Sequence, residues 1–237
     1  MDLLLTDFEK KLPHHEMIFV EGGEFDMGGS DAEARDNEKP VHRVWISPFY
    51  MGKYPVTQAI WKVVMGTNPS NFKGENHPVE KVSWNDTQTF LQKLNEKTGK
   101  TYRLPTEAEW EFAARGGIYS QDYLYAGSDK LKEVGWYSGK KTHPVGQKMP
   151  NELGLYDLSG NSWEWCEDWY SGGYYQKCAD RGMVENPTGP ENGSLRVYRG
   201  GGWRSNPRGC RIAYRNNFSP EYRAVDLGFR LALSSPV

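Results

Sequence analysis

The sequence lacks the features that mark membrane, zinc-dependent and nucleic-acid-binding proteins. No apolar run approaches the length that spans a bilayer, which argues against an integral membrane protein. The 237 residues hold 29 Lys and Arg against 31 Asp and Glu, and a net charge of −2 gives no general attraction to nucleic acid. The few cysteines and histidines show no zinc-ligand spacing. We therefore expect no nucleic-acid partner and no zinc chemistry.

Cysteine is scarce, which limits both cross-linking and redox chemistry. The three cysteines are Cys166, Cys178 and Cys210, so at most one internal disulfide can form. The spacing of Cys166 and Cys178 permits such a bond without requiring it. The sequence contains no C-x-x-C motif.

Glycine, proline and aromatic residues are abundant instead. The chain has 26 Gly, 14 Pro and nine Trp, and aromatics make up 14% of it. Disordered chains are poor in aromatics, and helix interiors exclude Gly and Pro, so neither disorder nor a helix bundle fits. The length suits a single core, and the sequence shows no linker or internal repeat. We predict one loop-rich α+β domain over residues 16–237, preceded by an N-terminal extension of residues 1–15.

Three short helices are predicted by signals at their ends. Thr57 is positioned to cap a helix that runs through Met65 and stops at Gly66. A capping-box pattern begins at Ser83 and its helix stops at Gly99, and a second begins at Thr106 and stops near Gly116.

Strands are predicted by short apolar runs next to glycine. Met17–Val20, Gly22-Gly23 and Glu24–Met27 form a hairpin pattern. Residues 42–50 alternate apolar and polar positions until Pro48 interrupts them. Leu227–Leu233 alternates with period two, which predicts a single strand buried on one face.

Several motifs, in order along residues 16–234, carry a resemblance to a known family. They are MIFVEGGEFDMGG (17–29), KYPVTQ (53–58), HPVEKVSW (77–84), YRLPTEAEWEFAARGG (102–117), PNELGLYDLSGNSWEWCEDW (150–169), VYRGGGW (197–203) and GFRL (228–231). The chain resembles the formylglycine-generating enzyme (sulfatase-modifying factor) domain family. The resemblance implies a C-type-lectin-like fold of that type, with few short helices and strands and with the N- and C-terminal strands close together. Fold alone does not decide activity.

The resemblance also locates the positions where oxidase members carry a copper-binding cysteine pair. Counted back from Gly228-Phe229-Arg230, these positions fall near Arg204–Ser205 and near Pro207, and neither holds cysteine. Cu(I) needs soft thiolate ligands, which the lone Cys210 cannot supply as a pair. We therefore expect no copper and no catalytic residues. A copper-dependent formylglycine-generating oxidase remains an alternative.

A calcium site is implied by the same resemblance. Carried over by position, Asp157 and Glu164 would supply carboxylate oxygens, while Gly160 and Ser162 would supply backbone carbonyls. Hard oxygen donors of this kind suit Ca²⁺, here in a structural role. The alternative is that Asp157 caps a turn and that Glu164 pairs with an arginine.

Residues 204–226 interleave positions of structural type with a second, diverse set. We call this second set the candidate recognition surface: Arg204, Ser205, Asn206, Arg208, Gly209, Tyr214, Asn216, Asn217, Phe218, Tyr222, Ala224, Val225 and Asp226. Its Tyr, Arg, Ser, Gly and Asn content is typical of antibody paratopes. Every member can arise by adenine mutagenesis of an Asn codon, so the pattern resembles the variable proteins of diversity-generating retroelements.

We therefore predict a noncatalytic protein that binds an unidentified protein or glycan, with Tyr214, Phe218 and Tyr222 as anchors. A scaffold subunit of the same fold with one fixed partner is a further alternative. Residues 1–11 lack the pattern of a secretory signal, but a removed leader would leave no trace. We expect export or cell-surface display and leave a cytoplasmic location open, and a monomer fits the sequence.

Other conspicuous residues have structural explanations. Trp163, Trp165 and Trp169 belong to the motif that marks the fold, so core packing is favoured over a sugar platform. Glu107 and Glu111 are i, i+4 neighbours and Glu109 fits a capping box, which favours structural roles over an acid/base pair.

Overall fold

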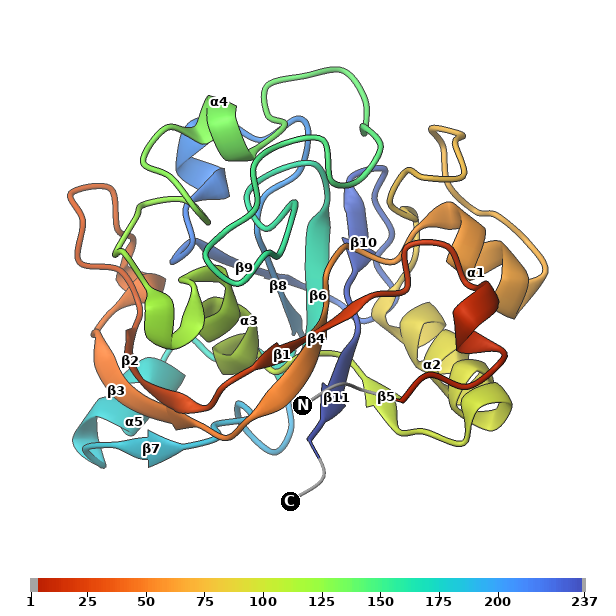
Figure 1. Ribbon diagram of the computed structural model, residues 1–237. Helices are drawn as coiled ribbons and strands as arrows, with labels where there is room; N and C mark the ends of the chain where they lie inside the picture. The colour runs from red at the N-terminus through yellow and green to blue at the C-terminus, as the bar shows by residue number, and fades with distance from the viewer. Residues whose placement is uncertain (1–3, 236–237) are drawn as a thin grey trace.

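Short strands in three sheets surround a central helix in the computed structural model, which describes residues 4–235 (Figure 1). The first sheet has the order β1-β4-β11-β5, the second β10-β6-β8-β9 and the third β2-β3-β7. The strands are β1 (Met17–Val20), β2 (Gly23–Met27), β3 (His42–Ile46), β4 (Phe49–Gly52), β5 (Tyr102–Arg103), β6 (Trp163–Trp169), β7 (Val184–Glu185), β8 (Arg196–Arg199), β9 (Arg215–Phe218), β10 (Leu227–Phe229) and β11 (Ala232–Ser234).

The helices are short, and loops connect most of them. The α-helices are α1 (Gln58–Met65), α2 (Trp84–Thr98), α3 (Glu107–Ala114), α4 (Leu131–Val134) and α5 (Tyr174–Asp180). The 3-10 helices are η1 (Glu9–Lys11), η2 (Asp36–Glu38), η3 (Gly117–Tyr119) and η4 (Pro207–Cys210). No helix within residues 4–235 is long and apolar enough to cross a bilayer.

The three predicted helices are confirmed, together with their end signals. The Thr57 side chain accepts a hydrogen bond from the backbone N–H of Ile60, and Gly66 ends α1 in the left-handed conformation at φ 77°. Ser83 and Thr106 each form a complete capping box at the start of α2 and α3. These signals act within one turn of chain, which is why sequence locates them well.

The predicted hairpin of residues 17–27 is wrong. β1 pairs antiparallel with β4, with Met17 opposite Gly52, whereas β2 pairs with β3 in another sheet. A Cβ atom at Gly22 would lie 2.6 Å from the carbonyl oxygen of Ile46, so this glycine allows close passage of two backbones. The glycine pair therefore marks a crossing between sheets and not a tight turn.

The single strand predicted over residues 227–233 is also corrected. β10 runs parallel to β6, while β11 belongs to the first sheet, beside β4. Arg230 separates them, and its buried guanidinium donates to the carboxylate of Glu164 and to the carbonyl oxygen of Gly52 at 2.7 Å. The chain leaves one sheet and enters the next at this residue, where the buried guanidinium finds the hydrogen-bond partners that it needs. β1 and β11 flank β4, so the terminal strands do share a sheet.

The core is aromatic, as the fold signature predicts. Trp110 and Trp165 have no exposed surface and Trp163 is 9% exposed. Trp169 is half-buried and stacks on Arg196, whose guanidinium carbon lies 3.5 Å from the ring centre. All three cysteines are buried and free, so the permitted disulfide is absent from residues 4–235.

Residues of the predicted N-terminal extension pack against the domain. The Glu9 side chain accepts a hydrogen bond from the hydroxyl of Tyr102 and forms an ion pair with Lys100 at 2.8 Å. His15 lies 3.0 Å from the same hydroxyl, and Leu12 joins the core around α1 and α2. Burial raises the pKa of Glu9, but the hydrogen bonds from Lys100 and Tyr102 outweigh it and lower that pKa to about 2.

Candidate recognition surface and the buried network beneath it

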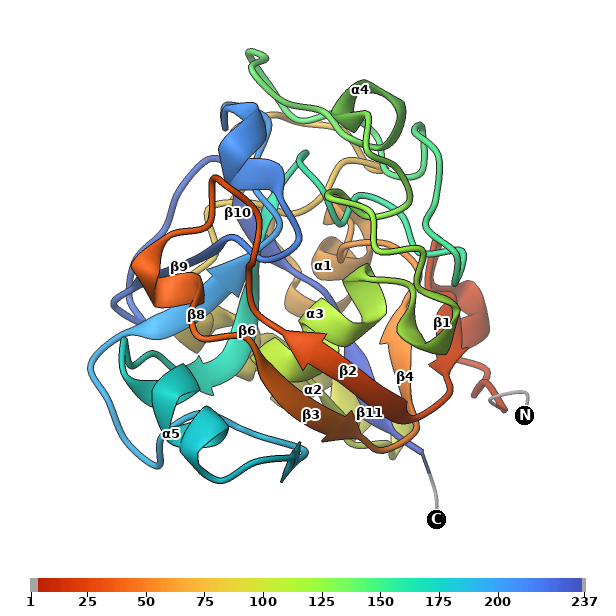
Figure 2. The same ribbon diagram turned by 90° about the vertical axis from the view of Figure 1, so that its left-hand side faces the viewer.

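The candidate recognition surface extends from the end of β8 through η4 and β9 to the start of β10. β9 is the edge strand of its sheet, with Phe218 opposite Arg196 on β8. The chain reaches η4 through Gly201, which has φ 81° and would place a Cβ 2.7 Å from the sulfur of Cys210. In Figure 2 the loop that carries η2 lies beside β9 and η4.

The structure exposes most of these residues to some degree. Arg204, Asn206, Arg208 and Phe218 are exposed, and Gly209 and Asp226 are buried. The others are half-buried: Ser205, Tyr214, Asn216, Asn217, Tyr222, Ala224 and Val225. All members of the candidate recognition surface except Gly209 and Asp226 are therefore at least partly accessible to a partner.

Two aromatic groups lie on this surface. Phe218 is 45% exposed and stacks on Tyr222, with ring centres 3.8 Å apart. The Tyr214 hydroxyl accepts a hydrogen bond of 2.8 Å from Arg35, whose guanidinium carbon lies 5.2 Å from the ring centre. Aromatic rings with polar tips are common anchors at interfaces. Sequence reasoning missed Arg35, because only the fold brings the loop of residues 30–39 to Tyr214.

Several polar members hold the loop conformation. Arg204 forms a two-pronged ion pair with the buried carboxylate of Asp226, at 2.7 and 2.8 Å. The Asn206 side chain accepts a 3.1 Å hydrogen bond from the backbone of Gly209 and so caps η4. Arg208 donates to the carbonyl oxygen of Glu33, and its guanidinium stays exposed.

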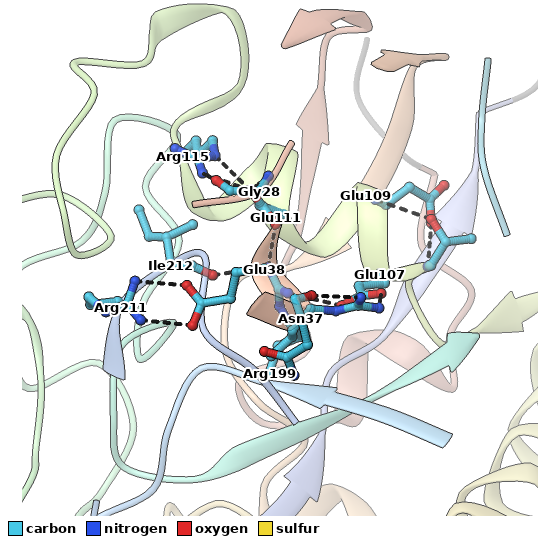
Figure 3. A network of polar contacts seen from close by, with 12 residues as sticks. Gly28, Asn37, Glu38, Glu107, Glu109, Glu111, Arg115, Arg199, Arg211 and Ile212 are labelled. Carbon is cyan, nitrogen blue, oxygen red and sulfur yellow. Dashed lines mark hydrogen bonds and ion pairs between the residues drawn. The ribbon is translucent and has the colours of Figure 1, made fainter. Parts of the chain in front are cut away.

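A buried ion network fixes the base of this surface (Figure 3). Glu107 on α3 accepts from Arg199 at 2.9 Å and from Arg215 at 2.7 Å. Glu111 accepts from Arg199 and, at 2.7 Å, from Arg115. All but Arg115 are at most 4% exposed in their side chains. These contacts confirm the structural roles predicted for Glu107 and Glu111.

The network extends into the surface through Arg211. Its guanidinium forms a two-pronged pair with Glu38 of η2, at 2.8 and 2.9 Å, and also bonds Asp31 at 2.8 Å. Arg211 and Glu38 are both buried. Burial raises the pKa of Glu111, but Arg115 and Arg199 outweigh it and lower that pKa, so the carboxylate stays ionised. Arg211 and Arg215 therefore anchor the segment that carries the exposed residues of the candidate recognition surface.

The cysteines do not provide a reactive thiolate. Cys210 is fully buried, and burial raises the pKa of its thiol to about 12. Burial likewise raises the pKa of Cys166 and of Cys178. The positions expected for the family pair hold Arg204–Ser205 and Pro207. Within residues 4–235, no group of three His, Cys, Asp or Glu side chains is arranged to hold a metal ion.

The residues of the expected calcium site are buried and already hydrogen-bonded. The Asp157 carboxylate accepts from the backbone of Gly146 at 2.8 Å and from the side chain of Asn161 at 3.1 Å. Both Glu164 oxygens face Arg230, and Trp110 donates to one of them at 2.7 Å. Burial raises the Asp157 pKa to about 6, a cost that a bound cation would relieve.

The other two expected donors, Gly160 and Ser162, lie between Asp157 and Glu164 along the chain. The carbonyl oxygen of Gly160 accepts a 2.8 Å hydrogen bond from the backbone of Ser162. Ser162 itself is buried. The donor chemistry thus fits Ca²⁺ at Asp157, whereas Glu164 would have to share its oxygens with Arg230. Calcium at these four residues stays a prediction.

Comparison with known proteins places this geometry in a family. The model of the sulfatase-modifying factor enzyme 1-like domain matches residues 4–235. The chain belongs to this family. The Chaperone protein LppX of Paenibacillus barcinonensis is 35% identical, over 92% of this chain and 89% of that protein. The formylglycine-generating enzyme of Thermomonospora curvata is 30% identical, over 91% of this chain and 92% of that enzyme.

A solved structure extends the comparison within this family. Treponema denticola variable protein 1 superposes with a TM-score of 0.83 at 33% identity, covering 92% of this chain and 95% of that one. The α+β, C-type-lectin-like fold of the formylglycine-generating-enzyme type is thereby confirmed. The relatives include a named enzyme and a named variable protein, so family membership alone leaves the activity undecided.

Proposed function

We propose that this chain is a noncatalytic binding protein that contacts its ligand through the candidate recognition surface. The observation that carries the proposal is the loss of the family's cysteine pair, whose positions hold Arg204–Ser205 and Pro207. A buried Cys210 with a raised thiol pKa cannot replace two accessible thiolates. The ligand is a protein or glycan, met outside the cell or at its surface.

The arrangement of residues 204–226 supports the variable-protein type of binder. Buried Arg211 and Arg215 lie in the same segment as the accessible Arg208, Tyr214 and Asn216. A surface built this way keeps its scaffold contacts while its accessible side chains change. The likeness to Treponema denticola variable protein 1 supports the same proposal.

The absence of oxidase chemistry is tested directly. The protein is loaded with Cu(I) and incubated with a sulfatase-motif peptide, and the peptide is analysed by mass spectrometry. We expect no conversion of the peptide cysteine. We also expect that iodoacetamide at pH 8 leaves all three protein cysteines unmodified in the native state and modifies all three in urea. Any turnover of the peptide would overturn the proposal.

Sequencing distinguishes a variable binder from a scaffold subunit with one partner. In a population of the source cells, substitutions in this gene should concentrate at the accessible members of the recognition surface and spare Arg211 and Arg215. A reverse-transcriptase gene and a near-identical, Asn-rich copy of the 3′ end should lie nearby. An invariant 204–226 segment without such a copy would favour the fixed-partner scaffold.

A further inference from the structure

A second cavity, separate from the candidate recognition surface, lies where β5, β7 and β11 approach the start of α3. Its volume is about 660 Å³, against about 40 Å³ for the depression beside Tyr222 and Arg204. Small-molecule sites commonly measure 300–1,000 Å³. In Figure 1, β7 and β11 lie at the lower end of the molecule, whereas η4, which belongs to the candidate recognition surface, lies near its top. We call this cavity the lower cleft.

Two walls of the lower cleft are held by hydrogen bonds between their residues. On one wall Arg103 forms a two-pronged pair with Glu109, at 2.6 and 2.7 Å, and Glu109 also accepts from the backbone of Thr106 at 2.9 Å. On the other, the Asn186 side chain accepts from the backbone of Ser47 at 2.8 Å and donates to its hydroxyl at 2.9 Å. Polar groups fixed in this way lose little freedom when a ligand binds.

The charges around the lower cleft balance. Arg103 and Glu109 neutralise each other, and the charge of Glu167 is opposed by that of Arg196, which donates to the backbone carbonyl of Glu167 and is stacked between Trp84 and Trp169. Burial raises the pKa of Glu167, and the arginines oppose this effect. A balanced site gives no net attraction to either an anion or a cation, so a neutral ligand suits it best.

Hydrogen-bonding capacity nevertheless remains in the lower cleft. Glu167 accepts one long hydrogen bond, 3.4 Å, from Gln88, and so its carboxylate keeps acceptor sites free. The cleft is also lined by Thr188, an exposed residue that carries a hydroxyl, and by the apolar ring of Pro48. A lining that combines hydroxyl, carboxylate and apolar groups suits a ring that carries hydroxyl groups and C–H faces.

We propose that the lower cleft binds a neutral, hydroxyl-rich small molecule of mono- or disaccharide size. Glu167 accepts hydrogen bonds from ligand hydroxyls, Arg103 and Thr188 contact neighbouring oxygens, and Pro48 packs against the ring. This site is independent of the candidate recognition surface and of the function proposed for it.

The test uses saturation-transfer NMR and calorimetry on the full chain. The probes are the methyl glycosides of glucose, galactose and mannose, with maltose and lactose. Tetrahydropyran is the matched ring without hydroxyls, and butylammonium and butanoate are the charged controls. We expect at least one sugar to bind and the three controls not to bind.

Variants locate the site. Glu167→Gln and Thr188→Val should each lower the affinity for the sugar at least tenfold, and the circular dichroism spectrum should stay unchanged. Glu185→Gln, exposed on β7 and outside the cleft, should bind like the wild type. The proposal is overturned if no sugar binds, or if tetrahydropyran or one of the charged controls binds with the same affinity as the sugars. It is also overturned if Glu167→Gln and Thr188→Val leave the affinity for the sugar unchanged.

Discussion

At the residue scale, the buried carboxylate of Glu107 joins two arginines to the central helix. Glu107→Gln would leave Arg199 and Arg215 buried with one negative charge fewer. Breaking a buried pair in this way costs about 3–5 kcal/mol, since the remaining charge is uncompensated. Urea unfolding followed by circular dichroism should show a loss of this size. The exposed Glu185→Gln is the control and should change the free energy of unfolding by less than about 0.5 kcal/mol.

Calcium is a second prediction at this scale. Binding at Asp157 would stabilise the fold by about 2.7 kcal/mol at a calcium concentration one hundred times the Kd. For a chain of this length, we expect the Tm to rise by about 5 °C or more in calcium and to fall again with EGTA. Asp157→Ala should remove the response, whereas Asp122→Ala, at an exposed loop position outside the four expected ligands, should keep it. A wild-type Tm that ignores calcium would contradict the site.

Side-chain roles were predictable only where the partners lie close in sequence. The capping by Glu109 follows from a four-residue pattern and is confirmed. The Arg35–Tyr214 contact joins residues far apart along the chain, and no local pattern indicates it. Likewise, no local pattern indicates that Arg211 pairs with Glu38, because the two residues are brought together only by the fold.

At the element scale, the buried carboxylate of Glu9 ties η1 to the domain. The pKa of Glu9 is lowered from 4.5 to about 2. Its contribution to stability is therefore fully present above pH 4.5 and is lost as the pH falls through 2. The shift corresponds to about 3 kcal/mol. Glu9→Gln should lower the free energy of unfolding by about that amount at pH 7 and flatten its pH dependence between 4.5 and 2.

The matched control for Glu9 lies in the same segment. Asp7 has a 92% exposed side chain, so Asp7→Asn should leave both the stability and its pH dependence nearly unchanged. Unfolding curves measured from pH 2 to pH 7 compare the two variants. If both behave alike, Glu9 does not hold η1 to the domain.

Helices were easier to predict than strand partners. Thr57, Ser83 and Thr106 each start a helix through contacts within three residues. The partners of Met17–Val20 and Leu227–Phe229 depend on distant strands, and the apolar patterns fit several pairings. Pairing therefore had to come from the structure, and the hairpin prediction failed for that reason.

At the scale of the whole molecule, the fold separates side chains that hold it together from side chains that can change. Arg199, Arg211 and Arg215 tie α3, η2 and β9 into one base. In the segment that this base holds, Arg208 and Phe218 are exposed, and Asn216 and Asn217 are half-buried. Composition predicted such an aromatic, loop-rich core. It did not predict which arginines are buried in it, because residue type alone does not distinguish a buried arginine from an exposed one.

This separation makes a final prediction. The fourfold variant Arg208→Ser, Asn216→Ser, Asn217→Ser and Phe218→Tyr should keep a cooperative thermal transition and lose no more than about 2 kcal/mol, since each site is accessible. The double variant Arg211→Ser and Arg215→Ser should fail to fold, because it leaves Glu38 buried without its arginine partner and leaves Glu107 with Arg199 alone. Calorimetry and urea unfolding measure both. If the fourfold variant melts without cooperativity, residues 204–226 are structural throughout, and the variable-binder proposal fails with them.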